Sequence, residues 1–251
     1  MELKKSWIDA CDNRVSRRSY IDKKIEDEHI KKLVSIIGKI NDCSELNIQL
    51  VEDGKGVLSG FKASYGMISG VKTFIALVGN KNIQNYKQKL GYYGEMLVLE
   101  ATELGMATCW VGGTYSKSEC ANYINIKTDE ELICIIAIGY ADKDLTIKEK
   151  VVKNLNKKNK TIEDMLVHKT NDIPSWVLSG VEYALEAPSA VNKKPVIYEF
   201  NDNRVEAIIS KPNHGYEEVD LGISMLHFEL GALKEGYKGN WKYENYHHVF
   251  S

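Results

Sequence analysis

An arginine-rich segment near the start of the chain has the residue types of an anion-binding site. Within residues 14–20, Arg14, Ser16 and Arg18 alternate with other residues, and alternate side chains of an extended backbone point to the same side. Guanidinium groups present planar forks of donors that suit a phosphate, and a serine hydroxyl adds a neutral donor. The pattern therefore predicts a phosphate site, with a solvated basic turn as the alternative.

Two other segments place small residues on a constrained backbone. Pro188 ends an expected helix, and Ser189 and Asn192 follow it in a loop that a second proline also stiffens. In the other segment, a short strand ends in Gly112-Gly113, where the missing side chains let a flat ligand approach backbone N–H groups. Taken singly, each segment is also compatible with an ordinary turn.

Composition narrows the class of protein. The chain has 251 residues, 43% of them hydrophobic, and a net charge of −2, so it lacks the basic excess of a nucleic-acid-binding protein. Its longest apolar run, 132–141, is too short to cross a membrane, and the first residues lack the apolar core of a signal peptide. Five cysteines without a Cys-x-x-Cys pair predict buried free thiols. We therefore expect a cytoplasmic protein without a disulfide framework or a zinc site.

Hydrophobic periodicity gives the elements that must position these segments. Helices are expected over 3–13, 26–40, 83–104, 116–124, 174–186 and 220–235. Strands are expected over 47–51, 73–78, 107–111, 132–138, 196–200, 205–209 and 240–243, with 132–138 in the centre of a sheet. A glycine-rich loop (54–70) and a lysine-rich connector (142–160) separate them, and His247-His248 is expected to be a solvated tail.

The N-terminal and C-terminal parts of the chain contain the same spacing of two glycines and a tryptophan. Gly91, Gly105 and Trp110 have the same spacing as Gly222, Gly236 and Trp241, and both sets frame an apolar helix, a glycine stop and a tryptophan-containing segment. The match predicts an internal duplication, with a first half over 1–160 and a shorter second half over 161–251. Such a chain mimics a symmetric dimer; coincidence is the alternative.

Together the three segments resemble the nitroreductases, a family of flavin mononucleotide (FMN) oxidoreductases. Residues 14–20 resemble its opening motif Arg-x-Ser-x-Arg-x-Phe/Tyr, and 100–113 resemble its helix, Leu-Gly and strand ending near Gly-Gly. Residues 187–195 resemble Ala-Pro-Ser-x-x-Asn-x-Gln-Pro, with Lys194 in place of Gln. Residues 157–163 resemble the basic segment that closes on the phosphate, with Asn159 where an arginine is more usual.

The order of the motifs resembles one branch of that family. In ordinary members the Pro-Ser-x-x-Asn motif follows soon after the first motif, whereas here it stands in the second half. The second half in turn lacks Arg-x-Ser-x-Arg. This split resembles the internally duplicated branch named "putative TM nitroreductases". The resemblance implies an α+β, nitroreductase-like fold of two related half-domains, each with a small sheet and flanking helices, fused as a pseudo-dimer that is monomeric in solution.

The resemblance also implies a site and a reaction. Arg14 and Ser16 would hold the FMN phosphate with Lys158, Arg18 would lie near the N1/C2=O edge of the ring, and a backbone N–H near Gly112-Gly113 would face N5. NAD(P)H and then a small flat electron acceptor, such as a nitroaromatic or a quinone, would react in turn by a ping-pong mechanism, with no side chain acting as a general acid or base. The expected cofactor-binding residues are Arg14, Val15, Ser16, Arg18, Tyr65, Val111, Gly112, Gly113, Lys158, Pro188, Ser189, Ala190 and Asn192.

Three other functions stay open on the sequence. The chain could be an FMN-binding protein or sensor without catalysis, because Phe61 and Tyr65 are large enough to fill the acceptor space. It could catalyse a different flavin reaction within the same fold, since a fold does not determine a function. It could also be a structural protein without a cofactor.

Overall fold

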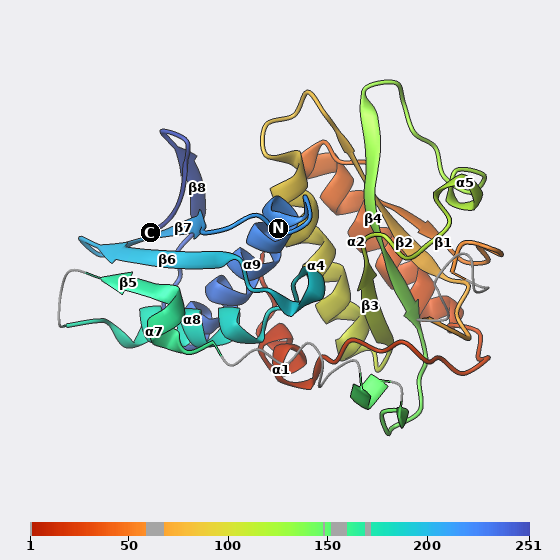
Figure 1. Cartoon of the computed structure of the whole chain (residues 1–251), viewed down its shortest axis with the longest axis horizontal. Helices are drawn as coiled ribbons and strands as arrows, with labels where there is room; N and C mark the ends of the chain where they lie inside the picture. The colour runs from red at the N-terminus through yellow and green to blue at the C-terminus, as the bar shows by residue number, and fades with distance from the viewer. Residues whose placement is uncertain (1, 59–67, 148, 152–159, 169–171) are drawn as a thin grey trace.

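Two sheets with helices between them form the protein (Figure 1). The computed structural model describes residues 2–58, 68–147, 149–151, 160–168 and 172–251. The elements of the N-terminal half are α1 (Ser6–Asn13), α2 (Asp27–Ser44), β1 (Gln49–Val51), β2 (Phe74–Asn80), α4 (Tyr86–Glu103), β3 (Ala107–Val111), α5 (Lys117–Cys120) and β4 (Glu130–Gly139). Those of the C-terminal half are α7 (Ile162–Met165), β5 (Leu166–His168), α8 (Ser175–Glu186), the short 3-10 helix η1 (Ala190–Asn192), β6 (Val196–Asn201), β7 (Arg204–Ile209), α9 (Glu217–Lys234), β8 (Trp241–Glu244) and β9 (His247–Phe250).

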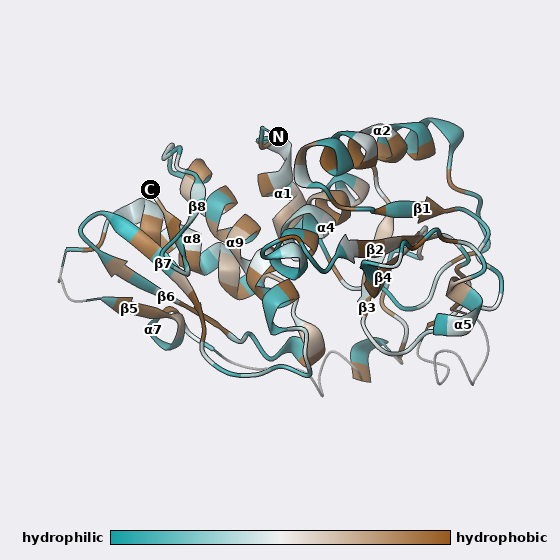
Figure 2. Ribbon diagram, turned by 90° about the horizontal axis from the view of Figure 1, so that it is seen from above, coloured by the Kyte–Doolittle hydropathy of each residue, from teal (hydrophilic) through white to brown (hydrophobic). Residues whose placement is uncertain are grey.

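The first sheet has the order β1-β2-β4-β3 and is antiparallel throughout. Strand β4 is internal, as its nearly continuous apolar run predicts, because both faces of the sheet are covered. Ile136 and Ile138 pack with the helices α2 and α4, while Ile135 and Ala137 pack in a second cluster on the opposite face. Helix α2 has hydrophilic and hydrophobic residues in alternation along its length, as expected for a helix with one buried face (Figure 2).

The second sheet has the order β5-β6-β7-β9-β8 and packs on α8 and α9 through an aromatic core. The expectation of a solvated tail at His247-His248 is wrong, because these residues begin β9, which pairs with both β7 and β8. Asn245 and Tyr246, both with positive φ, form the turn between β8 and β9. Phe250 at the end of β9 is fully buried. Burial of its ring in the core accounts for the extra strand.

The two halves share a topology. The order and directions of β6-β7-β9-β8 repeat those of β1-β2-β4-β3, and α4 and α9 each have 18 residues. Both helices end in the same way: Gly105 and Gly236 have left-handed φ values of 73° and 82°. In both, the next N–H bonds back to the helix, from Met106 to Ala101 O (2.8 Å) and from Tyr237 to Ala232 O (3.0 Å). The expected glycine stops are confirmed.

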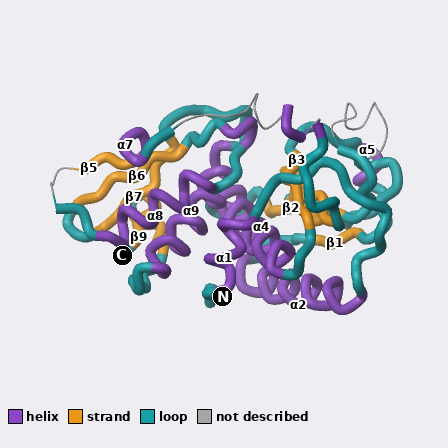
Figure 3. The backbone as a smooth tube through the Cα atoms, turned by 90° about the horizontal axis from the view of Figure 1, so that it is seen from below, coloured by secondary structure: helices purple, strands orange, loops and turns teal. Residues whose placement is uncertain are grey.

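Helices α4 and α9 join the halves, and with α1 and α8 they lie between the two sheets (Figure 3). Their contact is reciprocal. A Cβ atom on Gly91 would overlap the carbonyl oxygen of Val219, and one on Gly222 would overlap the carbonyl oxygen of Gln88. Both positions require glycine because the backbones touch.

None of the described helices is both long enough and apolar enough to span a bilayer. All five cysteines are free, and four of them, Cys11, Cys109, Cys120 and Cys134, are buried, as expected.

Candidate functional site

The arginine-rich segment lies along the edge strand of the first sheet. Ser16 forms a parallel bridge with Thr108 of β3, and the N–H of Arg17 donates to Thr108 O at 2.9 Å. Arg17, between Ser16 and Arg18, is buried. Arg18 is half-buried, and its guanidinium makes no hydrogen bond or ion pair with the described part of the chain.

Arg17 anchors this segment through Glu149. Its Nε lies 3.1 Å from Glu149 Oε1, and the N–H groups of Arg18 and Ser19 donate to the same oxygen. Burial alone would raise the pKa of the Glu149 carboxyl, but these hydrogen bonds and one from Thr146 outweigh it and lower the pKa to about 2. The backbone of the segment is therefore fixed from behind.

Arg14 connects the two halves. Its Nη1 donates to Ser16 Oγ (3.4 Å), and its Nη2 donates to the Glu186 carbonyl at the end of α8 (3.3 Å). Its Nε lies 3.6 Å from Oε1 of the fully buried Glu95 on α4. That Nε is buried and has no hydrogen-bond partner among the described residues. Arg14 thus holds an unused buried donor at the junction of α4, α8 and the arginine-rich segment.

Glu95 ties the same junction to β3 and α9. Its Oε2 accepts a hydrogen bond from the Trp110 indole N–H (2.7 Å), and Oε1 lies 3.0 Å from His227 Nε2. Trp110 in turn packs with Ala187 and Val219 of the second half. The end of β3 and the start of the 187–195 loop therefore meet.

The 187–195 loop carries a third cation. Lys194 donates from its ammonium group to the Ala187 carbonyl, and its backbone N–H donates to Ser189 Oγ (2.9 Å). Burial, and after it the nearby charge of Arg14, lower the pKa of Lys194 to about 8. Lys160, from the basic segment, donates to the Lys194 carbonyl (2.7 Å). The loop is thus fastened both to itself and to the basic segment.

The Gly-Gly end of β3 faces the second half. A Cβ atom on Gly112 would lie 2.7 Å from the ring of Tyr216, the residue that precedes α9. A Cβ atom on Gly113 would meet nothing within 4 Å, so the backbone there is open. Val111 is buried. Gly112 therefore lets the strand end approach the ring of Tyr216, and Gly113 leaves free space beside the backbone.

The described structure brings together the three segments that the sequence singles out. Arg14, Ser16 and Arg18 lie beside β3, and Arg14 reaches the end of the helix that precedes Pro188, Ser189, Ala190 and Asn192. Val15 is exposed on the other side of the segment. Tyr65 and Lys158 lie outside the described residues. Sequence reasoning missed Glu95, Asn213, Asp220 and His227, although an acidic residue inside an apolar helix, as at Glu95 and Asp220, is a signal of a buried polar network.

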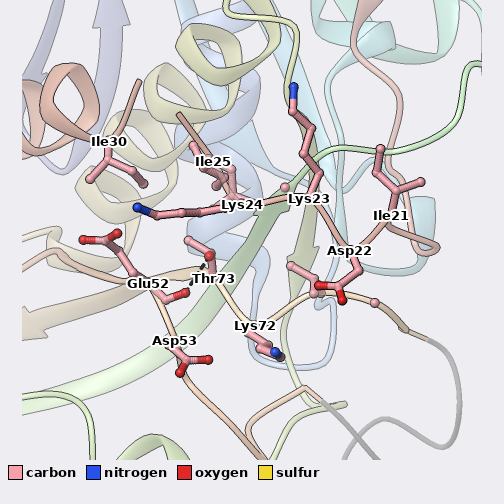
Figure 4. A pocket seen from close by; sticks show the side chains of 14 residues that line it. Ile21, Asp22, Lys23, Lys24, Ile25, Ile30, Glu52, Asp53, Lys72 and Thr73 are labelled. Atoms are coloured by element: carbon pink, nitrogen blue, oxygen red, sulfur yellow. Dashed lines mark hydrogen bonds between the residues drawn. The ribbon is translucent and has the colours of Figure 1, made fainter. Parts of the chain in front are cut away.

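The donor set fits FMN. Among the described residues, the buried Arg14 Nε has no hydrogen-bond acceptor and the Arg18 guanidinium has neither a hydrogen bond nor an ion pair. With the partly buried ammonium of Lys194, these groups favour an anion such as a phosphate. The open backbone at Gly113 suits a flat ring. A cavity of about 330 Å³ elsewhere shares no residue with these segments (Figure 4). Two of the three lysines that line it, Lys23 and Lys24, form ion pairs with Glu26 and Asp27.

Comparison with known proteins identifies the family. A family model described as "Putative TM nitroreductase" matches residues 7–232. The chain belongs to this family. The resemblance drawn from the three motifs is therefore confirmed.

One solved structure agrees with the fold over nearly the whole chain. The crystal structure of a "putative nitroreductase" from Thermotoga maritima is 20% identical, with a TM-score of 0.64, covering 97% of this chain and 92% of that chain. An FMN-dependent nitroreductase from Clostridium difficile is 17% identical (TM-score 0.44; 54% of this chain and 87% of that chain). A "putative NADH oxidase" from Clostridium acetobutylicum is 23% identical (TM-score 0.44; 54% and 89%). No protein of curated function matches this nitroreductase-family chain.

Proposed function

We propose that this nitroreductase-family protein is an FMN-dependent oxidoreductase that uses NAD(P)H to reduce small flat acceptors such as nitroaromatics or quinones. The observation that carries the proposal is the position of the Arg14 side chain between two motifs. Its guanidinium contacts Ser16 of the opening motif and the carbonyl of Glu186 before the Pro-Ser-x-x-Asn loop, and its buried Nε–H has no hydrogen-bond acceptor among the described residues. Motifs from both halves thereby converge on one cationic site.

Each residue has a task in this proposal. Arg14 and Ser16 bind the phosphate, and Lys194 adds positive charge beside them. Arg18 supplies a cation for an electron-rich ring edge, and the backbone at Gly112-Gly113 supplies N–H donors. FMN, when bound, supplies the redox chemistry, which none of the side chains of the site can provide. Pro188, Ser189, Ala190 and Asn192 close the site from the second half.

We further propose that the halves are an internal duplication that forms a pseudo-dimer with a single flavin site. The shared strand order, the matching ends of α4 and α9 and the reciprocal contact at Gly91 and Gly222 support this origin. In a two-fold arrangement, residue i of one unit contacts residue j of the other and j contacts i, as these helices do. We expect a monomer, because the contact that joins two subunits in a dimer lies within the chain.

The test is the visible spectrum of the purified protein after addition of FMN, before and after anaerobic NADH or NADPH. We expect stoichiometric flavin uptake and bleaching by one nicotinamide. Arg14→Ala should weaken FMN binding about 30-fold, the size of one or two lost charge-assisted hydrogen bonds. Arg204→Ala, which removes only an exposed ion pair with Glu244, is the matched control and should leave binding unchanged.

Two results would contradict the proposal in different ways. Bound flavin that neither nicotinamide bleaches would leave an FMN-binding protein without this catalysis. A protein that takes up no FMN would remove the flavin site altogether.

A further inference from the structure

The loop after α8 has an unusual backbone. Val191, Asn192 and Lys194 have φ values of 46°, 52° and 47°, which lie in the left-handed region that favours glycine. Such values are uncommon for any side chain and costly for a β-branched residue such as Val191. A strained backbone persists only where surrounding contacts determine it, and such strain clusters at ligand sites.

Besides Lys160 and its own internal hydrogen bonds, the loop is held by two side chains from α9 and the turn before it. Asp220 Oδ1 accepts a hydrogen bond from the Ala190 N–H (2.9 Å), and Asn213 Nδ2 donates to the Ala190 carbonyl (3.0 Å). Asn213 Nδ2 also donates to Asp220 Oδ2 (2.5 Å). Both side chains are buried. Two side chains from outside the loop therefore hold both backbone polar groups of Ala190, one residue before the strained positions.

We propose that Asp220 and Asn213 are positioning residues, a clamp that holds the 189–194 loop in its left-handed conformation and so presents Ser189 and Asn192 to the flavin. This inference rests on the proposed function. The clamp acts through Ala190 and touches no ligand itself. Without it, the loop relaxes toward ordinary backbone angles and the site loses its preorganised wall.

Charge supports this role for Asp220. Burial raises the pKa of its carboxyl to about 6, against the hydrogen bonds from Ala190 and Asn213. The charged or titratable groups that face it are Glu217 on its own helix, Lys194 in the loop and Cys134 on β4. A protonated carboxyl carries its own hydrogen and loses one of the two accepting positions. The clamp therefore weakens as the pH falls through about 6.

The experiment is a double-mutant cycle between Asp220 and Val191. Asp220→Ala should lower FMN affinity about tenfold, measured by quenching of flavin fluorescence. Val191→Gly should change affinity little by itself, because glycine adopts φ near 46° without strain. In the double variant, glycine should restore most of the lost affinity, since the loop no longer needs to be held. A general loss of α9 stability would not be rescued by a glycine in the loop.

A second readout separates this inference from the proposed function. Amide hydrogen exchange of residues 189–194 in the protein without FMN should rise in Asp220→Ala and fall again in the double variant. Glu218→Ala, an exposed acid in the same helical turn, is the matched control and should change neither exchange nor affinity. If the wild-type protein took up no FMN, the proposed function would fail while the exchange data still tested the clamp. Unchanged exchange and affinity in Asp220→Ala, or no rescue by Val191→Gly, would overturn the clamp.

The pH profile adds a check on Asp220. Riboflavin is the probe, because it lacks the phosphate that titrates near the same pH. Its affinity should fall below about pH 6 in the wild type. It should be independent of pH in that range in Asp220→Asn, and a fall that persists in this variant would contradict the assignment.

Discussion

The first and second halves have the same topology and different ends. After the common tryptophan, β3 ends at Val111 and Gly112-Gly113 follow it, whereas β8 continues from Trp241 through 242–244, which read Lys-Tyr-Glu. The open backbone that suits a flat ring exists at one end only. The halves share the strand order and the glycine stops of their long helices. They differ in the residues after the tryptophan, where a ligand could bind.

Buried polar residues differ in the same way. By the spacing that relates Gly91 to Gly222, the place of Glu95 in α4 is taken by Leu226 in α9. By the same spacing, the position of Asp220 in α9 corresponds to Lys89 in α4. The partner of Arg14 thus lies in the first half, and the clamp on the 189–194 loop lies in the second. Each half contributes polar residues that the other lacks, and this difference favours the single composite site that we propose.

The arginine-rich segment, which has no counterpart in the second half, gives the largest expected effect. Arg17→Ala should lower the free energy of unfolding by about 3 kcal/mol, because it leaves the buried Glu149 without its partner. Arg18→Ala should leave stability unchanged and weaken FMN binding about tenfold. Denaturant unfolding and flavin titration measure the two effects. Equal flavin loss in both variants would show that the side-chain alternation is misassigned.

The pH dependence of the Arg17 effect follows from Glu149. Its pKa is lower in the folded protein than the ordinary value of 4.5, so it stabilises the fold above that pH. This stabilisation is lost as the pH falls from about 4.5 to about 2. The stability difference between the wild type and Arg17→Ala should therefore shrink over this range.

The reciprocal helix contact gives the next effect. Gly91→Ala and Gly222→Ala should each lower the free energy of unfolding by about 2 kcal/mol, because each Cβ overlaps a backbone carbonyl of the other helix. Gly38→Ala, where a Cβ meets nothing within 4 Å, is the control and should not destabilise the protein. A large loss from one glycine and none from the other would break the two-fold correspondence.

Lys194, where this chain departs from the glutamine of the family motif, gives a smaller effect. Lys194→Gln should weaken FMN binding about fivefold at pH 7, since it removes one cation beside the phosphate. The pKa of Lys194 is lowered to about 8, so its charge is lost and FMN affinity falls by a similar factor as the pH rises through that value. The variant should lack this alkaline fall. Lys193→Gln, which removes a loop cation that donates to the Pro212 carbonyl, is the charge-matched control and should not remove the alkaline fall.

The smallest effect on FMN binding is expected when the Gly-Gly end of the first half is copied into the second half. Tyr243→Gly with Glu244→Gly recreates the Gly-Gly end, but no Arg-x-Ser-x-Arg segment lies in the second half to complete a site. Equilibrium titration should still give one FMN per chain with unchanged affinity. Binding of two FMN would refute the single composite site.

Most of the fold could be predicted because local patterns determine it. The apolar periods of α4 and α9, their glycine stops and the run in β4 each carry their signal within the element. The expected strand over 107–111 is β3 itself. The C-terminal strand was missed because two histidines suggest solvent exposure, while its burial depends on Phe250 meeting an aromatic core from distant elements.

The site could be predicted only in part. The segments at Arg14 and Ser189 are visible in the sequence because their residue types resemble known motifs. The residues that hold them, Glu95, Asp220 and Asn213, act through partners that lie far away in sequence, and no local pattern indicates which partner a lone buried polar side chain will find.

The backbone contact between α4 and α9 bears on the relative position of the two walls of the proposed site, the end of β3 and the loop after α8. With glycines at both crossing points, no side chain lies between the helices there to change rotamer and alter their separation. Val219, whose carbonyl oxygen meets Gly91, packs in one cluster with Trp110 of β3 and Ala187 after α8, so the crossing also helps to fix where the strand end and the loop lie. Two glycines that lie outside the proposed site therefore help to hold its two walls in place.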